Sequence, residues 1–510
     1  MIENRTNKFV KNAFGTALYQ IINTICGLIT PRIILLAYGS NINGLVNSIT
    51  QFLSFLAIME SGLALASQHS LYKPLAEKDV EQISKVVSAT RIAYNQVGYL
   101  FTTGTIILSF LYPFFAGTED LDYLSVVILV FVLSMNHILS FFVVSKYQVL
   151  FQADQRIYVI SIARTVSRIV NTVCIILLAS PNFNIILLRI IVSSSVIIQA
   201  IIISIYARIK YKNINFKAKP DKNSLTQRGY VFYEQILGFL MNSSPAIILT
   251  IIATLEDVSI YSIYNMVFAS LLGILGILSD GVNAAFGTLL YSKNTQHTNE
   301  VYSEFENFYY LSISIIYSVA LVMIVPFVRI YTVGVTDANY LLPGLGFLFT
   351  LNSLIYNLRT PHGLMIQAAG KFKETRHQNT IQSIILISLS FILGHFFGIY
   401  GILIASILAN LYRCIAYYLF VPKHIHIGSL LVTIKRAIIM ISVIVIIFIS
   451  FSLFLRNFYI NNFKDWIIIS FIVFIASTIL FFIVDLIFER KNLFKTIKRV
   501  MKIFKGGRND

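Results

Sequence analysis

Arginine side chains interrupt several long apolar runs of this chain. Arg32 lies inside the run Phe14–Tyr38, and later runs contain Arg164, Arg168 and Arg359. A charge near the centre of a lone membrane span costs about 2.5 to 3.5 kcal/mol, so such side chains usually face a bundle interior or a watery cavity. A guanidinium group stays charged and donates paired, planar hydrogen bonds, which suits phosphates and carboxylates. These four arginines are therefore the candidate binding residues for an anionic substrate.

The same positions allow simpler interpretations, which remain open. Arg32 lies past the middle of its run, so snorkelling to the outer interface is the alternative for its side chain. Arg164 and Arg168 are four residues apart and share a helix face, where a structural charge network is the alternative to substrate binding. The acidic residues of the apolar runs are Glu60, Glu234 and Asp280. These acids either pair with arginines or take up a coupling proton or sodium ion.

Three prolines mark positions where spans bend or unwind in some membrane proteins. Pro31, Pro245 and Pro361 lie within or near the middle of apolar runs. Because proline removes a backbone hydrogen bond, unwinding at such a residue either lines a cavity or provides a hinge, although ordinary spans also tolerate proline. We therefore name these three residues as hinge candidates. His362, beside Pro361, adds a polar group for which an interhelical hydrogen bond is the simpler role.

The composition places these residues in a polytopic membrane protein. The 510 residues are 56% hydrophobic and 12% charged, with a mean hydropathy of +0.75. Apolar runs of about 20 residues, the length that crosses a bilayer as a helix, recur from end to end. We predict an all-α integral membrane fold with about 14 transmembrane helices. The predicted spans are Phe14–Tyr38, Leu45–Ser67, Ile92–Phe115, Tyr123–Ser145, Ile157–Leu178, Ile185–Tyr206, Val231–Ala253, Ile260–Leu290, Tyr309–Ile330, Tyr340–Ala368, Ile381–Phe397, Gly401–Phe420, Ala437–Leu455 and Trp466–Phe488.

Basic residues indicate the side of the membrane that each loop occupies. With the amino terminus in the cytoplasm, only Arg456 and Lys464 of the 40 lysines and arginines fall in outer loops. This asymmetry predicts that both termini are cytoplasmic. The net charge of +17 is thus a topology signal, and no nucleic-acid partner is predicted. The basic tail after Phe488 fits either an interfacial helix on anionic lipid or a solvated tail.

An internal repeat relates the first six spans to the next six. Pro31-Arg32-Ile33-Ile34-Leu35 matches Pro245-Ala246-Ile247-Ile248-Leu249, and Glu60-Ser61-Gly62 matches Ser279-Asp280-Gly281. Further along, Gln152-Ala153-Asp154-Gln155-Arg156 matches Gln367-Ala368-Ala369-Gly370-Lys371. Matches in the same order predict two pseudo-symmetric six-helix lobes followed by two carboxy-terminal helices. The predicted segments are the first lobe 1–207, a basic cytoplasmic linker 208–228, the second lobe 229–422, the last two spans in 423–488 and a basic cytoplasmic tail 489–510.

On these features the chain resembles the polysaccharide repeat-unit flippases (O-antigen, capsule or exopolysaccharide) of the multidrug/oligosaccharidyl-lipid/polysaccharide exporter superfamily. The residues that carry the resemblance are the Tyr38-Gly39 turn, Glu60-Ser61-Gly62 and the Gln-Ala-x-x-basic ends of spans four and ten. The resemblance implies a transporter of the bacterial cytoplasmic membrane that moves undecaprenyl-pyrophosphate-linked oligosaccharides by alternating access. It also implies a cationic central cavity, contact with membrane lipids and cooperation with polysaccharide polymerase machinery.

Other functions fit these features less closely. A drug or cation antiporter of the same fold is the nearest alternative, and it would favour an acidic, aromatic cavity. A membrane-embedded polysaccharide polymerase is expected to need a long outer loop, which the predicted spans do not leave. The chain has no Gly-x-x-x-x-Gly-Lys-Ser/Thr motif, so no ATPase is predicted. Cys26, Cys174 and Cys414 lack metal-ligand or disulfide spacing, and we predict no metal, no cofactor and no catalytic residue.

Overall fold

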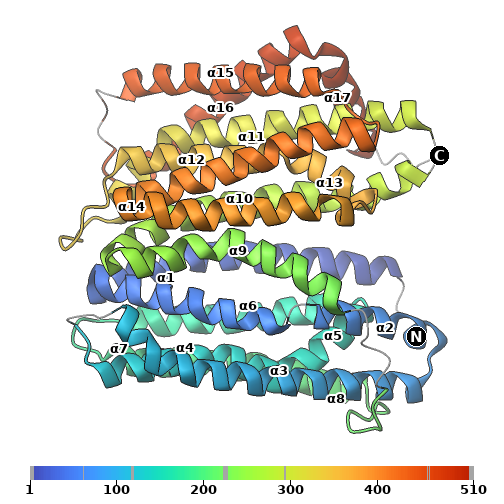
Figure 1. The fold of residues 1–510 in the computed structure, drawn as a ribbon, viewed down its shortest axis with the longest axis vertical. Coiled ribbons are helices and arrows are strands. Elements are labelled where there is room, and N and C mark those ends of the chain that lie inside the picture. Colours follow the sequence, from blue (N-terminus) through green and yellow to red (C-terminus); the bar gives the residue numbers. More distant parts are fainter. Residues whose placement is uncertain are drawn as a thin grey trace. The chain divides into compact units, whose positions relative to one another are not determined.

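The computed structural model describes residues 5–60, 62–116, 120–221, 228–291, 294–455, 458 and 460–504. Every regular element within these ranges is a helix, and the helices divide by their contacts into two units (Figure 1). Unit 1 comprises Met1–Ser262 with Gly334–Ala338, and unit 2 comprises Ile263–Val333 with Asn339–Asp510. The all-helical fold class predicted from the sequence is confirmed.

Unit 1 contains the helices of the amino-terminal half of the chain. They are α1 (Arg5–Leu56), η1 (Ala57–Glu60), α2 (Leu63–Glu77), α3 (Val80–Phe115), α4 (Tyr123–Leu139), the π-helical η2 (Ser140–Val144), α5 (Ser145–Ala153), α6 (Ile157–Leu178), α7 (Ile185–Ser193), α8 (Ser195–Lys210) and α9 (Arg228–Ile252). The most extensive packing in the unit is that of α1 along α6. α3 packs on α4, α4 on α7, and α6 on α8 (Figure 1).

Unit 2 is organised around one long helix, α11. Its elements are most of α10 (Leu255–Tyr291), α11 (Thr295–Tyr331), α12 (Pro343–Leu358), α13 (Thr360–Ala368), α14 (Phe372–His424), α15 (Leu430–Leu455), α16 (Phe463–Phe488) and α17 (Arg490–Phe504). α11 packs against α12, α15, α16 and α17, while α12 packs against α14. The two last apolar helices, α15 and α16, are therefore held to the unit through α11.

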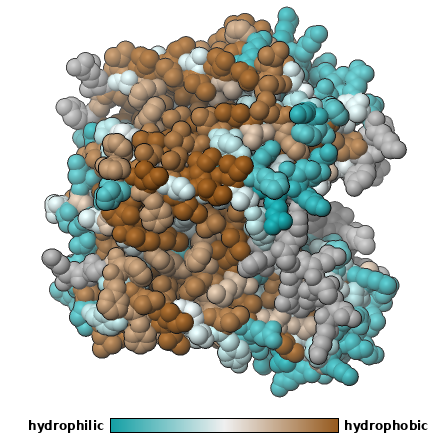
Figure 2. Space-filling view, in the orientation of Figure 1, coloured by the Kyte–Doolittle hydropathy of each residue, from teal (hydrophilic) through white to brown (hydrophobic). Residues whose placement is uncertain are grey.

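Eleven helical segments of the described chain are long and apolar enough to cross a membrane. Two of these segments contain a break: Val10–Glu77 at Gly39 and Lys373–His424 at Gly398. Arg359 divides α12 from α13, and each of the two is too short to count alone. These interruptions make the helices compatible with the fourteen predicted spans. Within each unit, hydrophobic residues cover the middle of the helices and hydrophilic residues gather near their ends (Figure 2).

The break in α1 falls at the turn that the sequence marks. Gly39 has a φ of 81°, a left-handed conformation that glycine adopts without strain. Asp337, from the Gly334–Ala338 segment of the same unit, accepts hydrogen bonds from the backbone N–H of Ser40 (2.6 Å) and from its hydroxyl (2.7 Å). The first N–H groups of a helical segment lack internal partners, so a carboxylate there stabilises the new start of the helix.

Two helix starts share one capping geometry, and their caps Asp79 and Asn294 have the same separation in the sequence as Gln152 and Gln367 of the repeat. Asp79 caps α3 by accepting a hydrogen bond from the N–H of Gln82 at 2.9 Å. Asn294 caps α11 by accepting one from the N–H of His297 at 3.0 Å. Short acceptor side chains are the preferred caps because they satisfy the free N–H groups of the first turn. α3 and α11 therefore begin at matching points of the two repeats.

Two helix ends are also alike. After α5 the N–H of Arg156 donates to the carbonyl of Phe151, and after α13 the N–H of Lys371 donates to the carbonyl of Ile366. This six-residue closure is the Schellman motif, which needs a left-handed residue before the donor. The left-handed residues are Gln155 and Gly370. The repeat thus has counterparts in the local backbone, whereas the division into two lobes stays a prediction.

The basic tail forms α17 and lies against α11. Leu493 is buried, and Lys495 Nζ contacts Glu300 Oε2 of α11 at 2.9 Å. One side of the tail is thus occupied by protein contacts. The predicted contact of its other side with anionic lipid stays a prediction.

Candidate functional site

Three of the four predicted arginines belong to α1 and α6, two helices that pack along each other. The two helices run parallel, because Lys8 Nζ lies 2.9 Å from Asp154 Oδ1 near their starts and Thr30 Oγ1 lies 3.5 Å from Thr172 Oγ1 further along. Along the helix axes, the contact of Thr30 with Thr172 therefore lies at a level between Arg168 of α6 and Arg32 of α1. Parallel packing therefore brings residues that are far apart in the sequence to neighbouring depths.

Arg168 of α6 lies beside Gly27 of α1. A Cβ built on Gly27 would lie 3.9 Å from Arg168 Nη2. The Arg168 side chain is half-buried, and its Nε is buried without a hydrogen-bond partner among the described residues. A buried donor that lacks an acceptor is destabilising, so its presence calls for an explanation such as a group that binds there.

Arg164 lies one turn before Arg168 and has an acidic neighbour. Its charge acts on Glu60, which also interacts with the hydroxyl of Tyr94 on α3. The charge of Arg164 is therefore partly compensated within unit 1, as the charge-network interpretation expects. Arg32 is half-buried and interacts with a neighbouring group. Of the three, Arg168 is the one with a buried Nε that has no hydrogen-bond partner in the described part of the chain.

Arg359 belongs to unit 2 and stands at the break between α12 and α13. Its guanidinium carbon lies 4.5 Å from the centre of the Tyr356 ring, a distance at which a cation and an aromatic face attract. Its Nη1 is buried, and no hydrogen-bond acceptor for it occurs in the described ranges. The predicted arginines thus fall into a group of three in unit 1 and one residue in unit 2.

The remaining predicted residues are less informative. The side chains of Glu234 and Asp280 lie outside the described residues. Pro31 and Pro245 lie inside α1 and α9, while Pro361 lies in the first turn of α13, where its missing N–H interrupts no helical hydrogen bond. The hinge role of the three prolines stays a prediction.

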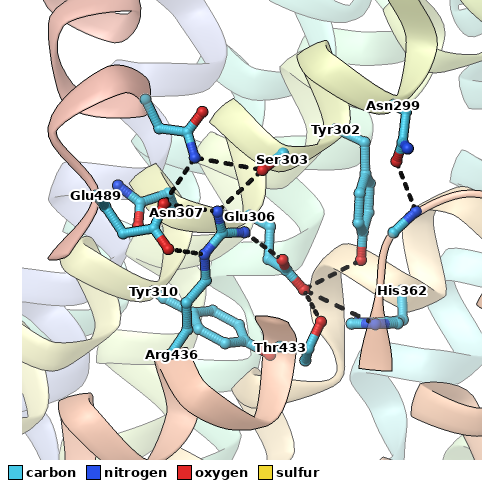
Figure 3. Close-up of polar contacts among 12 residues, drawn as sticks. Asn299, Tyr302, Ser303, Glu306, Asn307, Tyr310, His362, Thr433, Arg436 and Glu489 are labelled. Carbon is cyan, nitrogen blue, oxygen red and sulfur yellow. Dashed lines mark hydrogen bonds and ion pairs between the residues drawn. The ribbon is translucent and has the colours of Figure 1, made fainter. Parts of the chain in front are cut away.

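A buried ion network that the sequence patterns do not predict joins α11, α15 and the end of α16 (Figure 3). Arg436 Nη1 lies 2.5 Å from Glu306 Oε2, and Arg436 Nη2 lies 2.9 Å from Glu489 Oε2. Glu306 is 2% exposed and Arg436 is 6% exposed. Removing one partner of a buried ion pair is strongly destabilising, because the remaining charge is left without compensation. This network therefore holds the two last apolar helices to α11.

Polar groups surround Glu306 on its other sides. The Thr433 hydroxyl donates to Glu306 Oε1 at 2.7 Å, the Tyr302 hydroxyl lies 3.4 Å from the same oxygen, and His362 Nε2 lies 3.8 Å from it (Figure 3). His362 is 1% exposed, and its Nδ1 is buried without a partner in the part of the chain that the structure describes. His362 thus belongs to this network.

The three charges of the network escaped prediction because each lies just outside a predicted span. Glu306 precedes the ninth span, Arg436 precedes the thirteenth and Glu489 follows the fourteenth. The predicted topology places these residues in cytoplasmic segments, but the helices continue past the apolar windows and bury them. The sequence nevertheless contained a signal for this network. All three residues flank span ends that are predicted on the cytoplasmic side, so they were expected at a similar depth in the membrane.

A second network lies in unit 1, where α5 meets α6. Asp154 accepts hydrogen bonds from Lys8 (2.9 Å), Arg156 (2.7 Å) and the Tyr211 hydroxyl (2.6 Å). Burial by itself raises the pKa of this carboxyl, but the three donors and the charge of Lys8 hold the pKa of Asp154 below its ordinary value. Burial and the Asp154 charge raise the pKa of Tyr211. Asp154 therefore anchors the start of α1 as a carboxylate.

A cavity of about 30 Å³ beside the ion network is lined partly by Arg436, Asp485 and Glu489. Its volume suits a water molecule. Within the described ranges, no group of three or more His, Cys, Asp or Glu side chains is placed to hold a metal ion.

No protein-family model and no curated protein matches the sequence, but solved structures match the fold. The Lipid II flippase MurJ in an inward closed conformation has a TM-score of 0.68 at 15% identity, over 95% of this chain and all of that chain (100%). An inward-facing multidrug resistance MATE family transporter of the MOP superfamily has a TM-score of 0.62 at 14% identity, over 81% of this chain and 94% of that chain. A MOP superfamily transporter from Pyrococcus furiosus has a TM-score of 0.55 at 12% identity, over 82% and 96% of the two chains. The chain therefore has the fold of these transporters.

Proposed function

We propose that this protein is a flippase that moves undecaprenyl-pyrophosphate-linked oligosaccharide repeat units across the bacterial cytoplasmic membrane by alternating access. The observation that carries the proposal is Arg168, a cation inside an apolar helix whose Nε lacks an acceptor among the described residues. A pyrophosphate supplies strongly anionic oxygen acceptors, which a planar guanidinium binds in pairs. The fold supports transport, since one protein that shares it is described as a lipid II flippase.

The roles of the arginines follow from their surroundings. Arg168 and Arg32 bind the anionic head of the substrate along the contact of α1 with α6. Arg164 shares its charge with Glu60 and orients the group. Arg359 offers a second cationic position in unit 2. The buried acids Glu60, Glu234 and Asp280 are candidates for taking up the coupling ion.

The sign of the charge in the binding site distinguishes this proposal from a drug or cation antiporter. An antiporter that carries cations needs uncompensated acids, whereas α6 presents an arginine, Arg168, whose buried Nε has no acceptor among the described residues. Polarity varies among proteins of this fold, because one similar transporter is described as having a binding pocket of reverse polarity. The repeat units delivered by the flippase become substrates of polysaccharide polymerase machinery, the partner that we propose on the outer side.

Deletion of the protein followed by analysis of lipid-linked sugars tests the proposal. We expect complete undecaprenyl-linked repeat units to accumulate in the inner leaflet and surface polymer to be lost. Unchanged surface polymer with accumulation of a toxic cation would instead identify an antiporter. Repeat units that reach the outer leaflet but stay unjoined would identify a polymerase.

Point variants test the arginine that carries the argument. Arg168→Ala should abolish export at near-normal membrane abundance, and Arg168→Lys should retain part of it because an ammonium keeps the charge without the planar fork. At Arg32 we expect the same result: Arg32→Ala should abolish export, and Arg32→Lys should retain part of it. The repeat offers an internal control, since Ala246 stands at the position equivalent to Arg32. Normal export by Arg168→Ala would exclude the proposed role.

A further inference from the structure

Two basic residues of unit 1, Arg91 and Lys146, lie on α3 and α5, which pack against each other. The charge of Arg91 on α3 acts on the ammonium of Lys146 on α5. Helix packing explains their proximity: a Cβ built on Gly98, two turns after Arg91, would lie 2.9 Å from the ring of Phe142, one turn before Lys146. Tyr99 adds an edge contact to Phe142, with ring centres 5.1 Å apart. The helices pack in opposite directions, so Arg91 and Lys146 meet beyond the aromatic contact.

The polar neighbours of these two cations do not neutralise them. Arg91 is half-buried, and its Nε is buried without a hydrogen-bond partner within the described ranges. Lys146 is also half-buried; its Nζ donates to the backbone carbonyl of Phe142 at 3.3 Å and lies 5.1 Å from the centre of the Tyr147 ring. Two like charges at short range repel more strongly as water is excluded. Among the described residues, neither Arg91 nor Lys146 forms an ion pair with an acidic side chain.

The internal repeat shows that the fold does not require this arrangement. Counted from the equivalent caps Asp79 and Asn294, the position of Arg91 in α3 corresponds to that of Glu306 in α11. Counted from the equivalent ends of α5 and α13, Lys146 corresponds to Pro361. At the two positions where the first repeat has cations, the second repeat has an acid, Glu306, which belongs to its own ion network, and a proline, Pro361.

We infer that Arg91 and Lys146 form a phosphate-binding site that receives a diphosphate head group before it reaches Arg168. The guanidinium supplies paired donors and the ammonium a compact point charge, so together they suit two adjacent phosphates. In the predicted topology, the start of α3 lies on the cytoplasmic side, where a lipid-linked substrate is made. The role in transport rests on the proposed function, whereas the binding of phosphate does not.

Calorimetric titration of the purified full-length protein with inorganic pyrophosphate tests the site. Arg91→Gln and Lys146→Gln should each weaken binding about tenfold, and the double variant about a hundredfold, in line with charge-assisted hydrogen bonds. Lys146→Arg, which keeps the charge, should bind within a few-fold of the unmodified protein. Lys85→Gln is the matched control on α3, because Lys85 already contacts Glu81 at 2.6 Å. Neutralising one of two repelling cations should also leave the melting temperature unchanged or higher, which separates lost binding from misfolding.

Two outcomes of the titration overturn the inference. Pyrophosphate binding by the double variant at the affinity of the unmodified protein would remove the site. Binding lost equally in Lys85→Gln would reduce it to a general effect of surface charge.

Competition distinguishes the two sources of a phosphate head group. Displacement of pyrophosphate by undecaprenyl diphosphate in nanodiscs, at concentrations where phosphatidylglycerol has no effect, assigns the site to the substrate. Stronger displacement by phosphatidylglycerol assigns it to membrane lipid and overturns the role in transport. If the protein exports no lipid-linked sugar and the pair still binds pyrophosphate, the proposed function fails and the phosphate site stands.

Discussion

Gly27 of α1 and Arg168 of α6 are complementary in shape, because the missing side chain of the glycine leaves the space beside the guanidinium. Arg168 Nη2 lies 3.9 Å from a Cβ built on Gly27, an ordinary contact distance. Gly27→Ala should therefore fit and leave export close to normal. Gly27→Leu should fill the space and displace the guanidinium, reducing export at least tenfold at similar membrane abundance. Equal export by both variants would show that the position of Arg168 does not matter.

The pairing of Glu60 with Arg164 predicts a rescue. Arg164→Ala removes the charge that acts on Glu60 and leaves the acid uncompensated, so membrane abundance should fall. Glu60→Gln in the same chain should restore abundance, because no acid then remains to be compensated. Quantitative immunoblotting of membranes measures both. Loss of export without loss of abundance in Arg164→Ala would assign this arginine to the substrate instead.

The ion network of unit 2 predicts a large effect on stability. Arg436→Met leaves the buried Glu306 without its cation and should lower the free energy of unfolding by about 3 to 5 kcal/mol. Adding Glu306→Gln should recover part of the loss. Chemical denaturation in detergent measures the change. The exposed pair of Lys73 with Glu77 is the control, and Lys73→Met should leave the denaturation midpoint unchanged.

Asp154 predicts a pH-dependent contribution to stability. The pKa of its carboxyl is lower in the folded protein than its ordinary value of 3.8, so the contribution is complete above that value and is lost as the pH falls through the folded pKa. At neutral pH, Asp154→Asn should lower the stability by about 2 kcal/mol, the range of a hydrogen bond to a charged group. The difference from the unmodified protein should vanish in strong acid. Asp122→Asn is the control, because Asp122 makes no side-chain cap.

The predicted topology is tested by labelling single cysteines. In a variant without Cys26, Cys174 and Cys414, cysteines at Asp122, Glu256 and Asn461 should react from outside with an impermeant thiol reagent. Cysteines at Lys219, Lys293 and Lys371 should react only after the membrane is opened. Reversed labelling would contradict the orientation and the cytoplasmic access that we propose.

Local properties of the chain were readable from the sequence. Hydropathy averaged over about 20 residues depends only on neighbours in the sequence, so the all-helical membrane class followed from composition and run length. The turn after Tyr38 followed from the glycine beside it, and the repeat predicted that the ends of α5 and α13 would be alike. The candidate role of Arg168 followed from the cost of burying a charge.

Partnerships between distant helices were decided only by the tertiary structure. That Gly27 makes room for Arg168 depends on the register of α1 with α6, and no pattern within either helix encodes that register. The contact between Glu306 and Arg436 likewise depends on α11 and α15 extending beyond their apolar windows to a common depth. The proximity that we infer for Arg91 and Lys146 depends on the packing of Phe142 against Gly98. Candidate residues can be identified from side-chain type and spacing in the sequence. Their partners depend on which helix surfaces pack together, because burial and ion pairing are properties of the packed surfaces.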